Sequence, residues 1–533
     1  MVSLKQDPKE KAPDYSQDAC QRLGDARAQK SVVEQDLREA YFFTRPRLSR
    51  QVSSMSKPTT TLDRDVDELA TGIGAEVSED FATEVIAAFF PLGQRWVVSS
   101  GEAARVDGAD DDDIAELQDD IEKYDLTVFA AINGSNFGSE IAETLDPDAS
   151  IGTMALWITN PGAGRPHRVE HVPTQELEIN IGPDGCIDDR FRVRHVKYRS
   201  LRSVIGKDVV LPAAIENKIK RQPGDYAEVV WCFWRDWDIP EDDRYVHVLL
   251  VDNKQVHYDH FVGEGCLPLV VFRFSPDKLH AWGNGPAIKS LQELRVLDTI
   301  TATTQDACEV ALNPPIWYPD DGVVNFDSGL EPGHAYAKRP GGNAGDFGSL
   351  AFMGSPDIGF YTATDLERRV KRKFFADYPE QKGDTPPTAT QWTDEMVRAQ
   401  RRIGTPGAKF WREGPYEIYR RFEFLLKADS KIEEVKFNNK PLTLTPNNPA
   451  TQAQDNQKLQ VATQLLGLVK NFFPQTSQAA IDEMATIEAM QKLVKDEVIK
   501  LRSKADAQKL VQQVLGAAQQ VSGGGNAQTP TAQ

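Results

Sequence analysis

The chain has 533 residues, with 61 Lys and Arg against 80 Asp and Glu, and its formal net charge is −19. Its length gives room for roughly three or four packing units, which excludes a peptide hormone or a disulfide-stabilised miniprotein. The acidic balance argues against broad nonspecific binding of nucleic acid, because such binding needs a basic surface. Hydrophobic residues make up 40% of the chain. That fraction is enough for a hydrophobic core but slightly low for a chain of this length, as expected when much of the surface contacts partners or water. We therefore expect an elongated subunit or an assembly component.

The five cysteines are scattered singly, without a CxxC pair. This pattern indicates neither a disulfide framework nor a zinc ribbon, and it favours a reducing cytosol. The longest apolar runs, residues 85–92 and 267–272, are far shorter than the roughly 18 residues of a membrane helix. Residues 1–11 are charged and lack the apolar stretch of a signal peptide. The sequence therefore predicts neither a membrane segment nor an export signal.

Helical periodicity dominates the N-terminal part of the chain. Apolar residues at three- and four-residue spacing predict one helix over residues 26–48 and a second over 63–90, each ending near a proline. Residues 107–125 contain ten acidic residues and one lysine, which is typical of a solvated acidic helix. The helical pattern then continues over residues 124–145.

From residue 151 onward the spacing of apolar residues changes from that of helices to that of β-strands. Short β-rich runs are separated by turn residues such as Asp252-Asn253-Lys254. We predict strands at 154–159, 176–181, 191–197, 227–234, 245–252, 256–262 and 267–274. The sequence thus predicts a β-rich layer over residues 151–275, between two helical parts, and an α+β fold class.

A long, mostly polar helix is predicted over residues 286–310, beginning at a proline suited to a first helical turn. Its apolar stripe is narrow, so packing against other copies of the chain would explain its stability. An irregular Gly- and Pro-rich segment follows, and a basic helix returns at residues 362–376. After the polar loop 377–389, further helices are predicted at 393–402, 411–427, 453–473 and 481–520, followed by a flexible tail at 522–533.

No catalytic constellation stands out. A Gly-x4-Gly-Lys-Ser/Thr loop is absent, which argues against an ATPase of that class. The pair Gly72 and Gly74 lacks the third glycine of a dinucleotide loop and fits helix packing better. His257, Asp259 and His260 form the best metal-like cluster, but in a strand His260 would point away from the other two. We predict no catalytic, cofactor or metal site.

Basic residues cluster in the helix predicted at 362–376. Its apolar stripe, Leu366, Val370 and Phe374, leaves Arg368 and Arg372 on the opposite face and Lys371 on the flank. Such a face can contact a phosphate backbone without reading bases. The alternative is a solubilising face or one that forms salt bridges between subunits.

The stretch 267–310 resembles the portal, or head-to-tail connector, of short-tailed phages. In that family an apolar strand ending in an arginine segment leads to an aromatic-Gly-x-Gly-Pro turn, matched here by Trp282, Gly283, Gly285 and Pro286. A stem helix with a Leu-x-x-Leu pattern follows, matched by Leu291, Leu294 and Leu297. Residues 69–98, 126–157 and 387–402 are also similar, and the resemblance covers roughly residues 30–520.

The resemblance implies an elongated subunit of a ring, usually of twelve copies, at one capsid vertex. The implied parts are an N-terminal wing region at 1–285 with helices over 26–145, stem helices at 286–310 and 362–376, a small α/β clip at 311–361, a channel loop at 377–389, wing return helices at 390–452, a helical crown at 453–521 and a tail at 522–533. It also implies a virion component assembled in the host cytoplasm. Double-stranded DNA would pass through the ring during packaging and ejection. The implied protein partners are terminase, the major capsid and scaffold proteins and a tail adaptor.

One departure concerns the loop at 377–389. Lys382 is its only basic residue, beside Asp377, Glu380 and Asp384. If the loop lines the channel, it would act sterically and would not grip phosphates. A mostly acidic wall would likewise let DNA pass without holding it.

Two alternatives stay open at this point. The first is another structural virion protein, a tail adaptor or a scaffold; scaffolds are mainly helical and seldom contain a β-rich middle like residues 151–275. The second is a metal-dependent nuclease using Asp110 to Asp113, but four consecutive acidic residues point in all directions around a helix. We therefore expect a structural protein and no enzyme.

Overall fold

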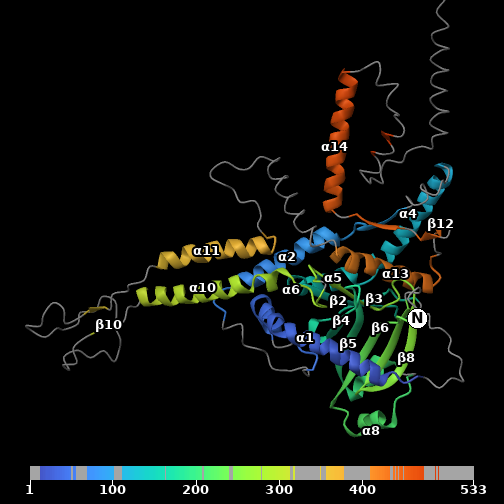
Figure 1. Cartoon of the computed structure of the whole chain (residues 1–533), viewed down its shortest axis with the longest axis horizontal. Coiled ribbons are helices and arrows are strands. Elements are labelled where there is room, and N and C mark those ends of the chain that lie inside the picture. The colour runs from blue at the N-terminus through green and yellow to red at the C-terminus, as the bar shows by residue number, and fades with distance from the viewer. Residues whose placement is uncertain are drawn as a thin grey trace, which may run out of the picture. The chain divides into compact units, whose positions relative to one another are not determined.

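The computed structural model describes the chain in two compact units, Met1–Pro446 and Asn447–Gln533 (Figure 1). The described residues are 13–49, 52–55, 69–100, 111–312 except 163, 207–208, 239–243 and 278, then 316–317, 348–349, 356–376, 409–432, 436–437, 440–447 except 442, 449–472, 486–487 and 490. The predictions for residues 377–389 and 393–402, and nearly all of those for 311–355 and 473–533, lie outside them.

The first helix, α1, spans Ser16–Thr44 and begins ten residues before its predicted start. Ala19, Leu23 and Ala26 of this early part are buried against the larger sheet. Because two of these contacts are alanines, the apolar period in the sequence is weak there. The prediction of a start at residue 26 was therefore wrong, whereas the predicted end near Pro46 was close.

The second helix, α2, spans Ile73–Phe89, so the prediction was wrong for residues 69–72, which are not helical. Asp298 holds the residues just before α2 in place. Its Oδ1 accepts hydrogen bonds from the backbone N–H of Ala70 at 2.8 Å and of Thr71 at 3.2 Å. Gly74 lies where a Cβ would come within 2.5 Å of the Phe43 carbonyl oxygen. Close packing of α2 on α1 therefore explains this glycine, in agreement with the helix-packing interpretation.

The acidic segment forms α4, Asp111–Asn133, and α5 follows at Phe137–Leu145. The break between them, at residues 134–136, was not predicted. A short helix α6, Asp148–Ile151, leads into the first sheet. Strand β1, Val97–Ser100, pairs with β14, Thr443–Pro446, and neither was predicted because a four-residue run carries little periodic signal.

Two antiparallel sheets make up the β-rich layer, and every predicted run from 154 to 274 is a strand in one of them. The smaller sheet has the order β3-β2-β9, with β2 at Thr153–Thr159, β3 at Arg168–His171 and β9 at Leu269–Arg273. The larger sheet is a meander, β4-β5-β6-β7-β8. Its strands span Leu177–Ile181, Ile187–Lys197, Tyr226–Arg235, Arg244–Val251 and Lys254–Val262.

Both faces of the larger sheet are covered, because consecutive residues of its strands point to opposite faces and consecutive positions in β6 and β7 are buried. Helix α1 covers the face that carries Val230, Cys232 and Trp234. The other face packs partly on the smaller sheet and partly on two short helices, α7 at Leu201–Ile205 and α8 at Ala213–Arg221. The β7–β8 hairpin turns at Asp252 and Asn253, whose φ angles are 49° and 61°. Positive φ at both positions is typical of a two-residue hairpin, as the turn signal predicted.

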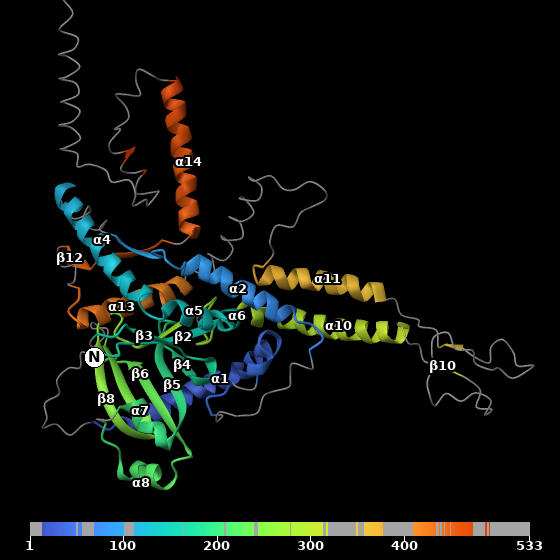
Figure 2. The same cartoon turned by 180° about the vertical axis from the view of Figure 1, so that it is seen from behind.

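After β9 the chain forms α9, Pro286–Lys289, and α10, Leu291–Leu312. The single helix predicted from 286 is therefore interrupted at Ser290. Helix α11, Pro356–Lys373, returns alongside α10 (Figures 1 and 2) and begins six residues before its predicted start. A π-helical segment at Arg412–Tyr416 precedes α13, Glu417–Ala428. In the second unit α14 spans Pro449–Phe472.

Three 3-10 turns and four short strands complete the described elements. The turns lie at Pro46–Leu48, Thr174–Glu176 and Tyr198–Ser200. The strands form two hairpins, β10 (Ile316–Trp317) with β11 (Gly348–Ser349), and β12 (Lys436–Phe437) with β13 (Lys440–Pro441). The first unit is thus a mixed α+β fold, in agreement with the predicted class.

Candidate functional site

The predicted turn at residues 282–286 crosses directly over the start of β2. The Gly285 N–H donates to the Ile151 carbonyl oxygen at 2.9 Å, and the Gly283 N–H donates to Oγ1 of Thr153 at 2.8 Å. A Cβ on Gly283 would lie 1.8 Å from the Gly152 carbonyl oxygen. A side chain at this position would therefore force the two backbone segments apart, which gives a physical reason for the glycines of the turn.

The remaining residues of this crossing also have defined places. Gly152 has φ 113°, a conformation that favours glycine, and its carbonyl oxygen accepts the Phe274 N–H at 2.9 Å. Trp282 is buried, and the Lys30 ammonium lies 5.2 Å from its ring centroid. Pro286 is the first residue of α9. The crossing therefore fixes the direction in which α9 and α10 leave the sheets.

Arg273, the arginine that ends β9, is fully buried beneath this turn. Its guanidinium donates to both carboxylate oxygens of Glu413, at 2.6 and 3.0 Å, and to the Ala281 carbonyl oxygen at 3.1 Å. Nη2, which makes the shorter bond to Glu413, also donates to the Gly185 carbonyl oxygen at 3.3 Å. One side chain thus joins the strand before the turn, the turn itself and the π-helical segment that precedes α13.

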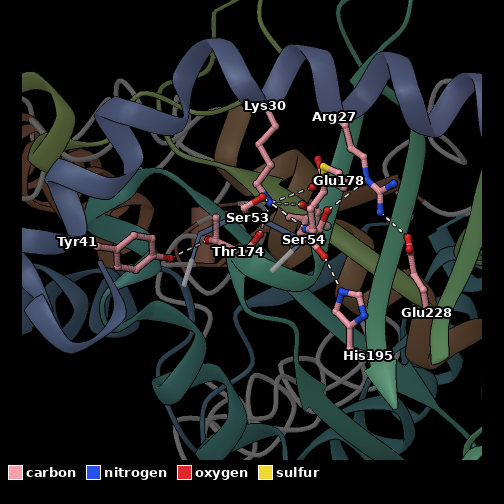
Figure 3. Close-up of polar contacts among 11 residues, drawn as sticks. Arg27, Lys30, Tyr41, Ser53, Ser54, Thr174, Glu178, His195 and Glu228 are labelled. Carbon is pink, nitrogen blue, oxygen red and sulfur yellow. Dashed lines mark hydrogen bonds and ion pairs between the residues drawn. The ribbon is translucent and has the colours of Figure 1, made fainter. Parts of the chain in front are cut away.

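A buried lysine holds α1 against the sheets (Figure 3). The Lys30 ammonium donates to the carbonyl oxygens of Thr174 at 2.7 Å and Leu177 at 2.9 Å, and it lies 3.2 Å from Oε1 of Glu178. Burial lowers the pKa of Lys30, although the neighbouring Glu178 opposes this shift. On the same helix, Tyr41 donates to Oγ1 of Thr174 at 2.7 Å. This cluster was not predicted from the sequence, because a lysine in an amphipathic helix is ordinarily solvated.

The helix pair α10 and α11 shares a narrow apolar seam. Leu294 and Leu297 of α10 and Val370 and Phe374 of α11 are fully buried, as their spacing predicted. At Gly359 a Cβ would lie 2.3 Å from Oγ1 of Thr304, so the two helices approach closely there.

Lys373 joins the end of α11 to the interruption between α9 and α10. Its ammonium pairs with Glu293 and donates to the Lys289 carbonyl oxygen at 2.9 Å. The interruption at Ser290 leaves the Lys289 carbonyl without an intrahelical partner, and Lys373 supplies one.

The three basic residues predicted on α11 have different surroundings. Arg368 and Arg372 are exposed, and no ion pair joins either of them to another described residue. Lys371 lies 3.7 Å from the carboxylate of Glu76 on α2, an ion pair within one subunit, whereas the salt-bridge alternative concerns pairs between subunits. Their neighbour Arg369 pairs with Asp365 at 2.7 Å. The fourth predicted residue, Lys382, lies outside the described residues.

The metal-like cluster does not form a site. His257 and Asp259 lie on one face of β8, His260 lies on the other, and Oδ1 of Asp259 accepts the His260 N–H at 2.8 Å. Within the described ranges no group of three or more His, Cys, Asp and Glu side chains could hold a metal ion. Asp110 and the side chains of Asp111 to Asp113 are not described. No described helix is both long and apolar enough to span a membrane.

The sequence profile of a family described as "Bacteriophage head to tail connecting protein" matches residues 16–493. No curated protein sequence shows significant similarity to the chain.

Among solved structures, a chain from the neck of an empty gene transfer agent (GTA) particle is similar with 12% identity and a TM-score of 0.37, covering 74% of this chain and 86% of its own. Chains from the native GTA virion and the native GTA neck have 12% and 13% identity and TM-scores of 0.35 each. They cover 77% of this chain and 91% and 92% of their own. TM-scores this low do not establish a common fold.

Proposed function

Because this chain belongs to the family of bacteriophage head to tail connecting proteins, we propose that it is a portal subunit: copies form a closed ring at one capsid vertex, and double-stranded DNA passes through the ring. The ring would contact DNA without sequence specificity and would not hydrolyse nucleotides. Terminase would drive packaging, the major capsid and scaffold proteins would surround the ring, and a tail adaptor would attach to it.

The α10–α11 pair is the observation that carries this proposal. One narrow seam holds the pair together, while large apolar side chains elsewhere on it face solvent. Val296, Phe360 and Tyr361 are 48%, 56% and 80% exposed. Scattered exposed apolar residues are ordinary, but adjacent exposed aromatic residues on a helix pair favour burial against a partner. In a ring, neighbouring copies supply that partner.

The basic face of α11 supports contact with DNA. Arg368 and Arg372 project from one helix with no ion-pair partner among the described residues, and such cations bind phosphate without reading bases. Lys371 contributes less, since Glu76 lies beside it. The channel therefore offers few cationic contacts in a strongly acidic chain, which suits a conduit better than a tight binder.

Electron microscopy of the purified full-length chain tests the proposal. We expect closed rings with a central opening over a range of protein and salt concentrations. A stable monomer under all these conditions would contradict it. No observation on the described residues favours a nuclease over this structural role.

A further inference from the structure

A basic surface interrupts the acidic chain at residues 197–221. This segment contains seven Lys and Arg against two Asp and Glu, although the whole chain has a net charge of −19. We call the exposed part of it the α8 basic surface and define it by Arg199, Lys220 and Arg221.

These three residues are brought together by the end of α8. The Arg199 N–H donates to the Pro223 carbonyl oxygen at 3.1 Å, two residues after Arg221. The preceding Tyr198 N–H donates to the Asp225 carbonyl oxygen at 2.9 Å. Arg199, from the 3-10 turn, therefore lies beside the last turn of α8, where Lys220 and Arg221 are located.

Most of the acidic groups nearby are already engaged. Glu216 pairs with Arg202 at 2.9 Å, and Asp252 pairs with Lys218 at 2.7 Å. Among the described residues no ion pair involves Arg199, Lys220 or Arg221, and one exposed carboxylate, Asp225, lies just after the segment. Cations in the last turn of a helix complement its dipole, but this does not account for Arg199. The α8 basic surface therefore keeps a net positive charge.

The opposite charge is concentrated in the first half of α4. Residues 111–122 contain seven acidic residues and no lysine or arginine, and Asp112, Glu116 and Asp119 recur at the spacing of one helix face. Helix α4 packs through Tyr124 and Val128 in the main core. Helix α8 packs through Ile215 in a separate core on the larger sheet. Helices α4 and α8 are therefore anchored in two different hydrophobic cores of the subunit.

We propose that the α8 basic surface docks the acidic first half of α4 from a second copy of this chain. The inference rests on the proposed ring and names one contact between neighbouring subunits. Two different surfaces meet in such a contact, and contacts of this heterologous kind form a ring when the rotation between neighbouring copies closes. Copies that each carry −19 repel one another, so a local contact of opposite charge steers their encounter and sets their register.

A charge-swap series on the full-length chain tests this contact, with mass photometry measuring the protein concentration at half-assembly. The first variant combines Arg199→Glu, Lys220→Glu and Arg221→Glu. The second combines Asp112→Lys, Glu116→Lys and Asp119→Lys, and a third carries all six changes. The matched control keeps the charge, with Arg199→Lys, Lys220→Arg and Arg221→Lys. Circular dichroism checks that each variant is folded.

We expect each single-surface variant to need about tenfold more protein for assembly, because like charges then face each other across the proposed contact. The six-change variant and the charge-keeping control should assemble like the wild type, and added salt should reduce the differences. Assembly of the first variant at the wild-type concentration would overturn the inference while leaving the ring intact. So would a six-change variant that stays impaired. Loss of binding to a short DNA duplex with unchanged assembly would assign the surface to nucleic acid instead. A wild-type chain that never assembles would overturn the proposed ring itself.

Discussion

Arg273 and Glu413 are 140 residues apart in the chain and form a two-bond ion pair at 2.6 and 3.0 Å. The arginine is fully buried, so its charge has been removed from water and depends on this partner. The pair joins the strand that precedes α9 and α10 to the segment that precedes α13. It therefore holds β9 directly against the π-helical segment Arg412–Tyr416.

Arg273→Ala should destabilise the chain strongly. Removing one partner of a buried pair leaves the other charge uncompensated, and we expect a loss of about 3–5 kcal/mol in the free energy of unfolding. Chemical denaturation monitored by circular dichroism measures this loss. The matched control is Arg295→Ala, because Arg295 pairs with Glu39 at the surface and should cost less than about 1 kcal/mol. Equal losses in the two variants would contradict the proposed role of Arg273.

Gly283→Ala should disrupt the crossing between the turn and β2. The new Cβ would lie 1.8 Å from the Gly152 carbonyl oxygen, so one of the two backbone segments has to move. We expect a clear fall in melting temperature. Gly24→Ala is the control, since Gly24 lies in α1 with no atom within 4 Å of an added Cβ. That change should stabilise α1 by about 0.5–1 kcal/mol. A Gly283→Ala variant with an unchanged melting temperature would show that the close approach is not required.

His247 should make the fold sensitive to acid. It is buried against the rings of Phe233 and Phe261, and burial lowers its pKa from 6.5 to about 3. Below pH 6.5 the unfolded chain therefore binds a proton that the folded chain excludes, so stability falls as the pH drops from 6.5 towards 3. The full effect is of the order of 1.4 kcal/mol per pKa unit, a few kcal/mol in all.

His247→Phe should remove this part of the pH dependence, because a third phenyl ring fills the same stack without titrating. Denaturation curves at pH 7 and pH 5 compare the variant with the wild type. The exposed His280 provides the control, and His280→Phe should leave the pH dependence as it is. An acid-induced loss of the same size in His247→Phe and the wild type would exclude His247 as its source.

Neutralising Arg368 and Arg372 together with Lys371 should reduce the amount of DNA packaged while leaving rings intact. These residues are the predicted phosphate contacts on α11, and Arg368 and Arg372 are the two without an ion-pair partner among the described residues. Arg369→Gln is the control, since Arg369 pairs with Asp365 on its own helix. Packaging assays measure the change, and electron microscopy checks the rings. Unchanged packaging in the triple variant would favour a salt-bridging or solubilising face.

Periodicity in the sequence predicted the regular parts of the fold. Strands β2 and β4 to β9 follow from short β-rich runs separated by turn residues. The α10–α11 seam follows from Leu294, Leu297, Val370 and Phe374 at helical spacing. These signals are local, since each depends on neighbours a few residues away.

The parts that could not be predicted depend on long-range contacts. The partner of Arg273 lies 140 residues away, and nothing near Glu413 in the sequence marks it as an anion for a buried guanidinium. Lys30 is surrounded by an ordinary helical pattern, yet it lies beneath Trp282. The non-helical entry to α2 depends on Asp298, which follows it by more than two hundred residues. Tertiary context overrides local preference at each of these positions.

Native mass spectrometry of the purified full-length chain tests the central claim most directly. The account predicts one dominant species whose mass is a whole multiple of the 59.3 kDa chain, with twelve copies as the expected number. This species should persist when the sample is diluted and the salt concentration is changed. A spectrum that contains only the 59.3 kDa monomer under every condition would contradict the account.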